Sequence, residues 1–217
     1  MDSRATTSTD GATAWTFFRQ WLKNPVAMSA ISPSGPQLAR KMVAELPVDA
    51  RRVIELGAGT GVFTRALIAH GIQASDLMVL ELNAELHAHL QTMFPAVHVQ
   101  HGDARELVRL ASECGFAQDG PADAVISGLG MLSMPRQVQH DILGAGFDCL
   151  QPQGRYIQFT YGPATPVSQD VLDSLALNAR RGAFVWRNLP PATVFVFTRN
   201  RSEHVSSVQV PVQQVRS

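Results

Sequence analysis

The chain has 217 residues, a mass of 23.6 kDa, and 18 basic against 18 acidic side chains. This length fits one domain, and a hydrophobic share of 45% is enough for a substantial core. No apolar run approaches the roughly 18–20 residues that cross a bilayer. Cys114 and Cys149 lack the spacing of metal ligands, and we expect them to be reduced, buried thiols. These features exclude a transmembrane protein, a disulfide scaffold and a zinc module.

The neutral total conceals an uneven distribution of charge. Residues 1–47 carry 5 basic and 3 acidic side chains, residues 48–150 carry 6 and 12, and residues 151–217 carry 7 and 3. Basic ends suit an anionic surface, either a membrane or a nucleic acid, although an ordinary solvated surface explains them equally well. The first residues contain no apolar core of a signal peptide, so we expect a cytoplasmic protein.

Two helices are predicted before the first strand. Residues 1–12 are rich in Ser, Thr, Gly and Ala and are typical of a frayed tail. Residues 13–24 place an apolar stripe at helical spacing, made of Ala14, Trp15, Phe18, Trp21 and Leu22, with Arg19 and Lys23 off the stripe. The second helix, over residues 36–46, can be capped by Ser34 and has Pro36 in its first turn.

From residue 53 onward, short β-branched runs alternate with helical patterns. This alternation indicates βαβ units and a mostly parallel sheet. We expect strands at 53–56, 77–82, 97–100, 122–127 and 155–160, with helices at 62–71, 84–94 and 136–150.

The end of the chain breaks the alternation. Residues 183–186 and 193–199 both look like strands, but the six residues between them cannot hold the crossover that a parallel pair needs. They should therefore pair antiparallel, as in the common methyltransferase fold and unlike a typical dinucleotide dehydrogenase. The predicted fold is thus α/β, a Rossmann-like class I methyltransferase with a seven-stranded sheet over residues 48–217 and an N-terminal helical arm over 13–47.

The strongest chemical signal follows the first strand. Glu55-Leu56-Gly57-Ala58-Gly59-Thr60-Gly61 lies between a strand and a helix, where glycines permit a tight turn and close approach to a ligand. Val62 stands where a dinucleotide fingerprint has its third glycine. Glu55 would repel a phosphate and attract an amino group. A tight turn without a ligand is the alternative.

The next two strands end in acidic residues at the same edge of the sheet. Glu81 can accept hydrogen bonds from both ribose hydroxyls of a nucleoside, or can be a solvated acid at a strand end. Asp103, in Gly102-Asp103-Ala104, can hold an adenine amino group, or can cap the following helix. Together the three signals fit a nucleoside with an amino-acid tail, which is S-adenosylmethionine.

At these residues the chain resembles a known family. The E-L-G-x-G-T-G, strand-end Glu and G-D-A motifs are similar to those of Rossmann-like S-adenosylmethionine methyltransferases. Residues 17–40, then SGLGMLSMP (127–135), QFTYGP (158–163) and residues 188–197 resemble the bacterial phospholipid N-methyltransferases, which convert phosphatidylethanolamine to phosphatidylcholine. The resemblance runs from about Trp15 to Arg199, and Gly130 stands where the family usually has proline.

The resemblance implies specific roles for the site residues. It implies that the cofactor is bound by the glycine motif, by Glu81 and Leu82, and by Asp103 and Ala104. It also implies Ser127 and Gly128 as a floor beneath the transferred methyl, and Ser32 and Ser34 as part of a segment that closes over the methionine end. S-adenosylhomocysteine would be the product, and no metal would be needed.

The remaining expectations concern the acceptor. Tyr161 ends the fifth strand and is our candidate for contacting a lipid phosphate, with Arg180, Arg181 and Arg187 as candidates to complete that site. Packing and solvent exposure are the respective alternatives. No general base is apparent, and His87, His89, His98 and His101 are interpreted as surface or hydrogen-bonded residues. A positioned amine can attack a sulfonium methyl without much help from side chains.

The apolar stripe of the first helix then has two interpretations. Trp15, Phe18, Trp21 and Leu22, with Lys23 beside them, can lie in the interface of a membrane rich in anionic lipid, or the stripe can pack on the protein's own core. The first interpretation predicts a peripheral protein of the inner membrane with phosphatidylethanolamine as its substrate and no nucleic acid partner.

Three other functions stay open. An RNA adenine dimethyltransferase has similar cofactor motifs but uses an aromatic residue to stack the flipped base, where this chain has Ser127-Gly128-Leu129-Gly130. A methyltransferase of soluble small molecules is the second alternative. A degenerate, membrane-anchored cofactor-binding module is the third, and the intact glycines and Glu81 argue against it.

Overall fold

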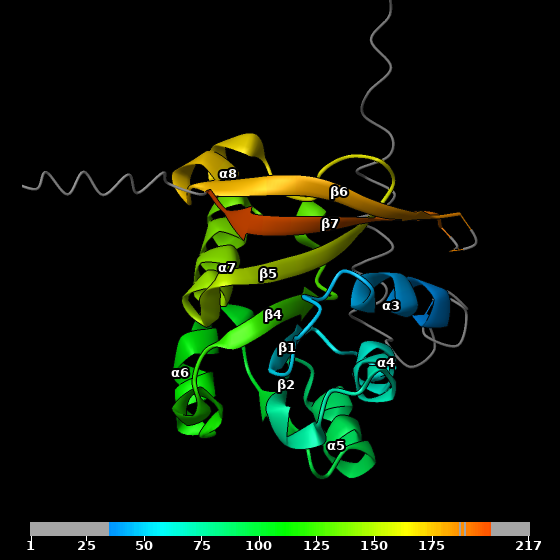
Figure 1. Cartoon of the computed structure of the whole chain (residues 1–217), viewed down its shortest axis with the longest axis vertical. Helices are drawn as coiled ribbons and strands as arrows, with labels where there is room; N and C mark the ends of the chain where they lie inside the picture. Colours follow the sequence, from blue (N-terminus) through cyan, green and yellow to red (C-terminus); the bar gives the residue numbers. More distant parts are fainter. Residues whose placement is uncertain (1–34, 187, 189, 201–217) are drawn as a thin grey trace, which may run out of the picture.

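A seven-stranded sheet forms the centre of the protein (Figure 1). The structure is a computed structural model that describes residues 35–186, 188 and 190–200. The strands lie in the order β3-β2-β1-β4-β5-β7-β6; the first five run parallel to their neighbours, and β7 pairs antiparallel with both β5 and β6. Their bounds are β1 (Val53–Leu56), β2 (Leu77–Glu81), β3 (His98–His101), β4 (Ala122–Ser127), β5 (Leu150–Tyr161), β6 (Leu177–Val185) and β7 (Ala192–Arg199).

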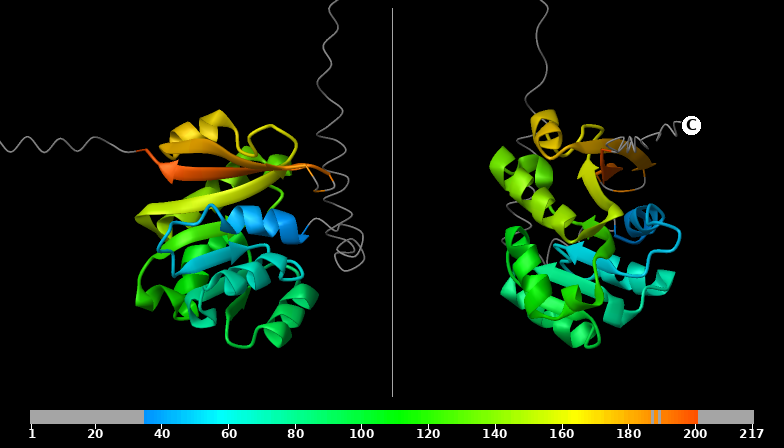
Figure 2. Two further views of the ribbon diagram at one scale, coloured as in Figure 1. Left: turned by 45° about the vertical axis from the view of Figure 1, so that its right-hand side comes forward. Right: turned by 60° about the vertical axis from the view of Figure 1, so that its left-hand side comes forward.

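Helices cover both faces of the sheet, because each parallel crossover carries its helix back over one face (Figure 2). On one face lie α3 (Gly35–Val43), α4 (Val62–His70) and α5 (Ala84–Met93), which share a hydrophobic core with alternate residues of the strands. On the other lie α6 (Leu107–Glu113), α7 (Arg136–Asp148) and α8 (Gln169–Ser174) around a second core. β1 and β2 are buried on both sides, as expected for central parallel strands.

The chain direction fixes where a ligand can bind. After β1 the chain builds outward through β2 and β3, and then returns to place β4 on the other side of β1. The loops after β1 and β4 therefore leave the sheet in opposite directions, and open α/β sheets bind ligands in the crevice at this point, outside the carboxyl ends of the strands.

The two cysteines are free thiols and half-buried. Burial, with a smaller contribution from the neighbouring Asp148, raises the pKa of Cys149 to about 11. No helix in the described part of the chain is both long and apolar enough to span a bilayer.

The predicted fold class is confirmed, and several strand bounds agree to within a residue. The structure differs from the sequence prediction between β5 and β6. β5 begins at Leu150 instead of residue 155, β6 begins at Leu177 instead of residue 183, and α8 was not predicted. The helix predicted over residues 36–46 is observed as α3, whereas the helix predicted over residues 13–24 and its membrane-contact residues lie outside the described residues.

Candidate cofactor and active site

The turn after β1 requires glycine at its first position. Gly57 has φ +69°, a backbone conformation that side chains rarely adopt, and its N–H donates to the Leu80 carbonyl at 2.8 Å. A Cβ on Gly57 would lie 2.6 Å from a methyl of Leu129, in the loop after β4. The turn is thus narrow and is held against both neighbouring strands.

The loop after β4 touches this turn through its backbone. The N–H of Gly128 donates to the Leu56 carbonyl at 2.8 Å, and a Cβ on Gly128 would lie 2.7 Å from the carbonyl oxygen of Gly57. Only glycine allows two main chains to approach this closely. The predicted floor and the predicted cofactor turn are therefore one continuous backbone surface.

Glu81 joins the end of β2 to the same turn. Its carboxylate is only 5% exposed, with Oε2 accepting from the Gly59 N–H at 2.9 Å and Oε1 accepting from the Asn83 N–H at 2.9 Å. A carboxylate has about four lone-pair directions, so each oxygen keeps capacity for one more donor. Glu81 can therefore fix the turn and accept two ribose hydroxyls at once.

The remaining motif residues lie around this centre. Ala58 is buried, and the Thr60 carbonyl accepts from the Arg65 guanidinium at 3.1 Å. Gly61 immediately precedes α4. Ala58 thus packs the turn against the protein interior, and the hydrogen bond from Arg65 holds it at Thr60.

The end of β3 presents Asp103 as a helix cap and an ion-pair partner. Its carboxylate accepts from the Arg105 N–H at 2.9 Å and from the Arg105 guanidinium at 2.6 Å, which holds the pKa of Asp103 below its usual range. Ala104 is buried directly after it. The Gly102 N–H donates to the Glu81 carbonyl at 3.2 Å, which attaches this segment to the end of β2.

Leu82 extends the site with an apolar surface. It is 61% exposed directly after Glu81, and its carbonyl lies 2.9 Å from Nε2 of His101. An exposed leucine beside the Glu81 carboxylate suits the face of an adenine ring. His98 is likewise hydrogen-bonded, with Nε2 3.0 Å from the Ser75 carbonyl.

Glu55 is a buried acid with spare capacity to accept a hydrogen bond. Its Oε2 accepts from the Thr64 hydroxyl at 2.6 Å, while Oε1 has no partner among the described residues. Burial is the largest cause that raises the pKa of Glu55 to about 7. An ammonium group would satisfy Oε1 and favour the charged carboxylate, so this residue fits the amino group of the predicted cofactor.

Replacing Glu55 with glutamine is expected to stabilise the cofactor-free protein at high pH. The folded wild type keeps the Glu55 proton up to about pH 7 while the unfolded chain loses it near 4.5, so wild-type stability falls as pH rises between these values. Glutamine removes this penalty, and Glu55→Gln should gain roughly 3 kcal/mol in the free energy of unfolding at pH 8. The gain should shrink below pH 7 and vanish below about 4.5.

Urea denaturation across pH 4–8 measures this difference. Glu85→Gln, which changes an exposed acid on α5, is the matched control and should follow the wild type. Equal pH dependence of Glu55→Gln and the wild type would contradict the assignment of Glu55 as a carboxyl that is protonated when folded.

The acceptor side of the site is organised by residues of β4 and β5. Ser127 is fully buried at the end of β4, and its hydroxyl accepts from the Leu129 N–H at 3.3 Å. Gln158, also buried, donates from Nε2 to the carbonyls of Leu129 and Phe159, both at 2.8 Å. The loop after β4 is therefore held from two strands.

An aromatic series leads from this loop to the edge of the sheet. Phe63 of α4 lies against Gly128, the rings of Phe63 and Phe159 are 5.9 Å apart, and those of Phe159 and Tyr161 are 5.5 Å apart. Burial raises the pKa of Tyr161. Tyr161 thus ends an apolar path that starts beside the predicted cofactor turn.

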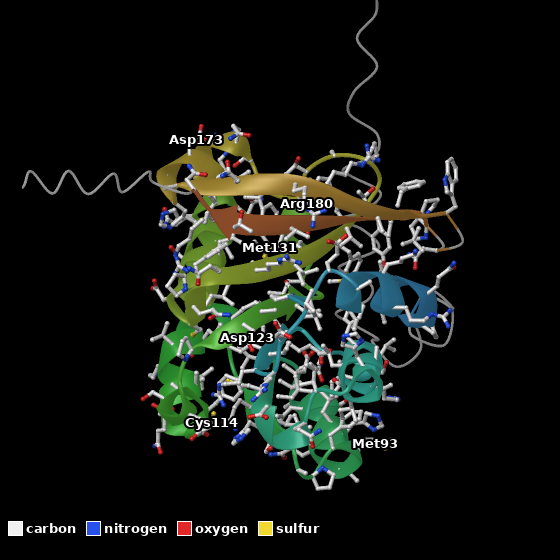
Figure 3. The ribbon with its side chains drawn as sticks, in the orientation of Figure 1. Met93, Cys114, Asp123, Met131, Asp173 and Arg180 are labelled. Atoms are coloured by element: carbon white, nitrogen blue, oxygen red, sulfur yellow. The ribbon has the colours of Figure 1, made fainter. Side chains whose placement is uncertain are left out.

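The two arginines proposed for the substrate phosphate lie farther back on β6. Arg180 pairs in register with Val196 and donates to a carboxylate oxygen of Glu45 at 2.6 Å (Figure 3). The Arg181 guanidinium lies 5.9 Å from the ring of Phe184. The structure therefore does not bring these arginines beside Tyr161. Ser32, Ser34 and Arg187 lie outside the described residues.

The sequence analysis missed two supporting residues, Thr64 and Gln158. Thr64 holds Glu55 through a contact that no sequence motif indicates, whereas His101 is hydrogen-bonded as predicted. Gln158 had a signal, since it interrupts the apolar run of β5 and an unpaired amide would not be buried there. In the described part of the chain, no group of three His, Cys, Asp or Glu side chains could hold a metal ion.

Solved structures share this fold. A glycopeptide N-methyltransferase, MtfA, complexed with S-adenosylmethionine aligns with a TM-score of 0.57 at 13% identity, covering 76% of this chain and 94% of that one. The same protein has been solved with sinefungin and with S-adenosylhomocysteine. A TehB-like S-adenosylmethionine-dependent methyltransferase from Corynebacterium glutamicum aligns with a TM-score of 0.57 at 18% identity, covering 88% of this chain and 100% of that one.

The fold is that of the Rossmann-like class I methyltransferases, and the residues of the turn after β1 fit the predicted S-adenosylmethionine. No protein-family model matches the chain. An ornithine lipid N-methyltransferase from Singulisphaera acidiphila is 31% identical over 185 residues, covering 82% of this chain and 92% of that protein. The chain belongs to the lipid N-methyltransferase family of this relative.

Proposed function

We propose that the protein methylates the headgroup amine of a membrane lipid, with S-adenosylmethionine as donor. The observation that carries this proposal is the Glu81–Gly59 contact within a complete cofactor turn, in a chain that belongs to a lipid N-methyltransferase family. Phosphatidylethanolamine is the acceptor that the sequence motifs favour. An ornithine lipid is the second candidate, favoured by the relative's own activity.

The proposed chemistry asks the protein mainly to hold two reactants in line. When bound, S-adenosylmethionine supplies a sulfonium methyl that is already activated for attack. Glu81 would hold the ribose, Glu55 the amino group, and Leu82 the adenine face. The backbone surface of Gly57 and Gly128 would then fix the position of the reacting end. Such positioning contributes most of the acceleration when neither reactant needs further activation.

The acceptor would enter past Tyr161. The path formed by Phe63, Phe159 and Tyr161 is apolar, so it would strip water from an amine as the amine approaches. The ammonium must release its proton, which water at the entrance can take, before the amine attacks, and the loss of water along the path disfavours the ammonium form. Tyr161 remains our candidate for contacting a lipid phosphate at the entrance. We propose a peripheral location on the inner membrane, with a preference for anionic lipid.

Parallel assays with two vesicle types test the acceptor. One contains phosphatidylethanolamine and the other an ornithine lipid, each mixed with the same fraction of an anionic phospholipid. We expect labelled methyl in the phosphatidylethanolamine vesicles, resolved as mono-, di- or trimethylated headgroups. The two headgroups differ in their anionic group, which is a phosphate in phosphatidylethanolamine and a carboxylate in the ornithine lipid. Label found only in the ornithine lipid would overturn phosphatidylethanolamine as the acceptor but would still support lipid N-methylation.

A further inference from the structure

The turn between β6 and β7 exposes an aromatic residue. Trp186, the first residue after β6, is 78% exposed, and its ring lies perpendicular to that of Phe184 with centroids 4.8 Å apart. A tryptophan with most of its surface in water contributes little to the stability of the fold. The position therefore suits contact with something outside the chain.

Strand register places this turn at the edge that holds the site. Val185 of β6 pairs with Ala192 of β7, and Ala192 pairs with Tyr161 of β5. Trp186 thus lies one residue beyond the row that ends in Tyr161, at the carboxyl-end edge of the parallel strands. Leu82 and Leu132, which follow β2 and β4, are exposed apolar residues at this same edge.

Hydrogen bonds hold the turn in place. Asn188 is 1% exposed; its N–H donates to the Val185 carbonyl at 3.3 Å and its side-chain amide donates to the Pro190 carbonyl at 2.8 Å. The Gly162 N–H donates to the Pro191 carbonyl at 3.1 Å, which ties the turn to the segment after β5. The exposure of Trp186 is therefore a feature of an anchored turn.

The chemistry of the turn matches a lipid interface. Tryptophan has an apolar body with one polar N–H, and it is enriched where hydrocarbon meets water. On the same strand the Arg181 guanidinium, near Phe184, has no carboxylate within ion-pair distance among the described residues, whereas Arg180 is paired with Glu45. Residues 151–217 are also net basic, which complements a surface of lipid phosphates.

We propose that the β6–β7 tip, defined as Phe184 and Trp186, inserts into the interface of a lipid bilayer. It would hold the carboxyl edge of the sheet, with the entrance at Tyr161, against the membrane that contains the acceptor. This inference rests on the proposed function, because an acceptor fixed in a bilayer requires the site to face it. A protein partner or a second copy of the chain is the competing occupant.

Tryptophan fluorescence tests the insertion directly. The chain contains three tryptophans, so the full-length variant Trp15→Phe/Trp21→Phe reports on Trp186 alone. Vesicles of phosphatidylethanolamine with an anionic phospholipid should shift its emission to the blue. Brominated acyl chains should quench it. Unshifted, unquenched emission from variant protein that sediments with the vesicles would overturn the proposal, as would a failure of the wild type to bind vesicles.

Vesicle sedimentation of Trp186→Ala gives a second readout. We expect its partition to fall by about tenfold, as a loss of 1.4 kcal/mol would give. Met93→Ala, which changes a 49% exposed residue at the end of α5, far from the β6–β7 tip, should bind vesicles like the wild type (Figure 3). Wild-type partition by Trp186→Ala, or a change in its oligomeric state alone, would overturn the proposal.

Methyl transfer by the wild type separates this inference from the proposed function. If Trp186 enters the bilayer but no lipid is methylated, the β6–β7 tip stands as a membrane contact and the proposed function fails. If lipid is methylated and Trp186 stays in water, the proposed function stands and the β6–β7 tip is not the contact.

Discussion

Glu81→Ala is expected to weaken S-adenosylhomocysteine binding by at least 100-fold. The substitution removes an acceptor for both ribose hydroxyls, and hydrogen bonds to a charged group contribute about 1.5–3 kcal/mol each. It also leaves the Gly59 N–H, now 2.9 Å from Oε2, without its acceptor and so loosens the cofactor turn. Isothermal titration calorimetry measures the loss of affinity.

Two further variants separate binding from folding. Glu81→Gln keeps one acceptor oxygen and the shape of the side chain, but its NH2 group must face the N–H of either Gly59 or Asn83. It should therefore lose less affinity than Glu81→Ala and also lower the melting temperature less. Glu85→Ala removes an exposed acid four residues along the chain and should bind like the wild type. Wild-type affinity in Glu81→Ala would show that this carboxylate is structural only.

Gly128→Ala should produce the second large effect, through sterics alone. The new methyl would lie 2.7 Å from the Gly57 carbonyl, and that neighbour is backbone, which cannot rotate away as a side chain can. The loop after β4 and the turn after β1 must then separate, at a cost of roughly 1–3 kcal/mol in the free energy of unfolding. Methyl transfer should fall more than stability, because this contact is the proposed floor of the reacting end.

Gly144→Ala is the matched control for this substitution. Its Cβ would meet only Leu175, at 3.9 Å, and the position is within α7, where alanine is favoured over glycine by up to about 1 kcal/mol. Gly144→Ala should therefore be neutral or stabilising, with full activity. If Gly128→Ala melts and turns over like the wild type, the two loops are not packed as described.

The central strands could be predicted because burial dictates their residues. Val53–Leu56 is buried along its whole length and Ala122–Ser127 at every position except Asp123, and the bounds of both strands match the prediction. β6 is different because it forms the edge of the sheet with one neighbour only, and residues 178–181 are polar or exposed. The alternation of apolar and polar residues is weak at such an edge, so the first half of β6 was not predicted. Arg180 and Arg181 were therefore interpreted as candidate site residues and not as part of a strand.

Some residues of the candidate site could likewise be predicted from sequence, and others could not. Gly57, Gly59 and Glu81 could be brought together from sequence, because parallel strands end at one edge and a motif identifies each loop. Gln158 and Thr64 act through side-chain contacts that depend on how strands and helices pack. The spacing of residues along the sequence does not reveal this packing. Trp186 was passed over because the chain around it suggested a hairpin and nothing else.

The measurement that tests lipid N-methylation most directly is transfer of labelled methyl from S-adenosylmethionine to three acceptors in parallel. These are vesicles of phosphatidylethanolamine and ornithine lipid with an anionic phospholipid, structured RNA, and soluble ethanolamine compounds. The site and its family predict label in the lipid fraction, and its loss in Glu81→Ala. Label in the RNA or the soluble amines alone would contradict lipid methylation and leave only the fold and the cofactor site in place.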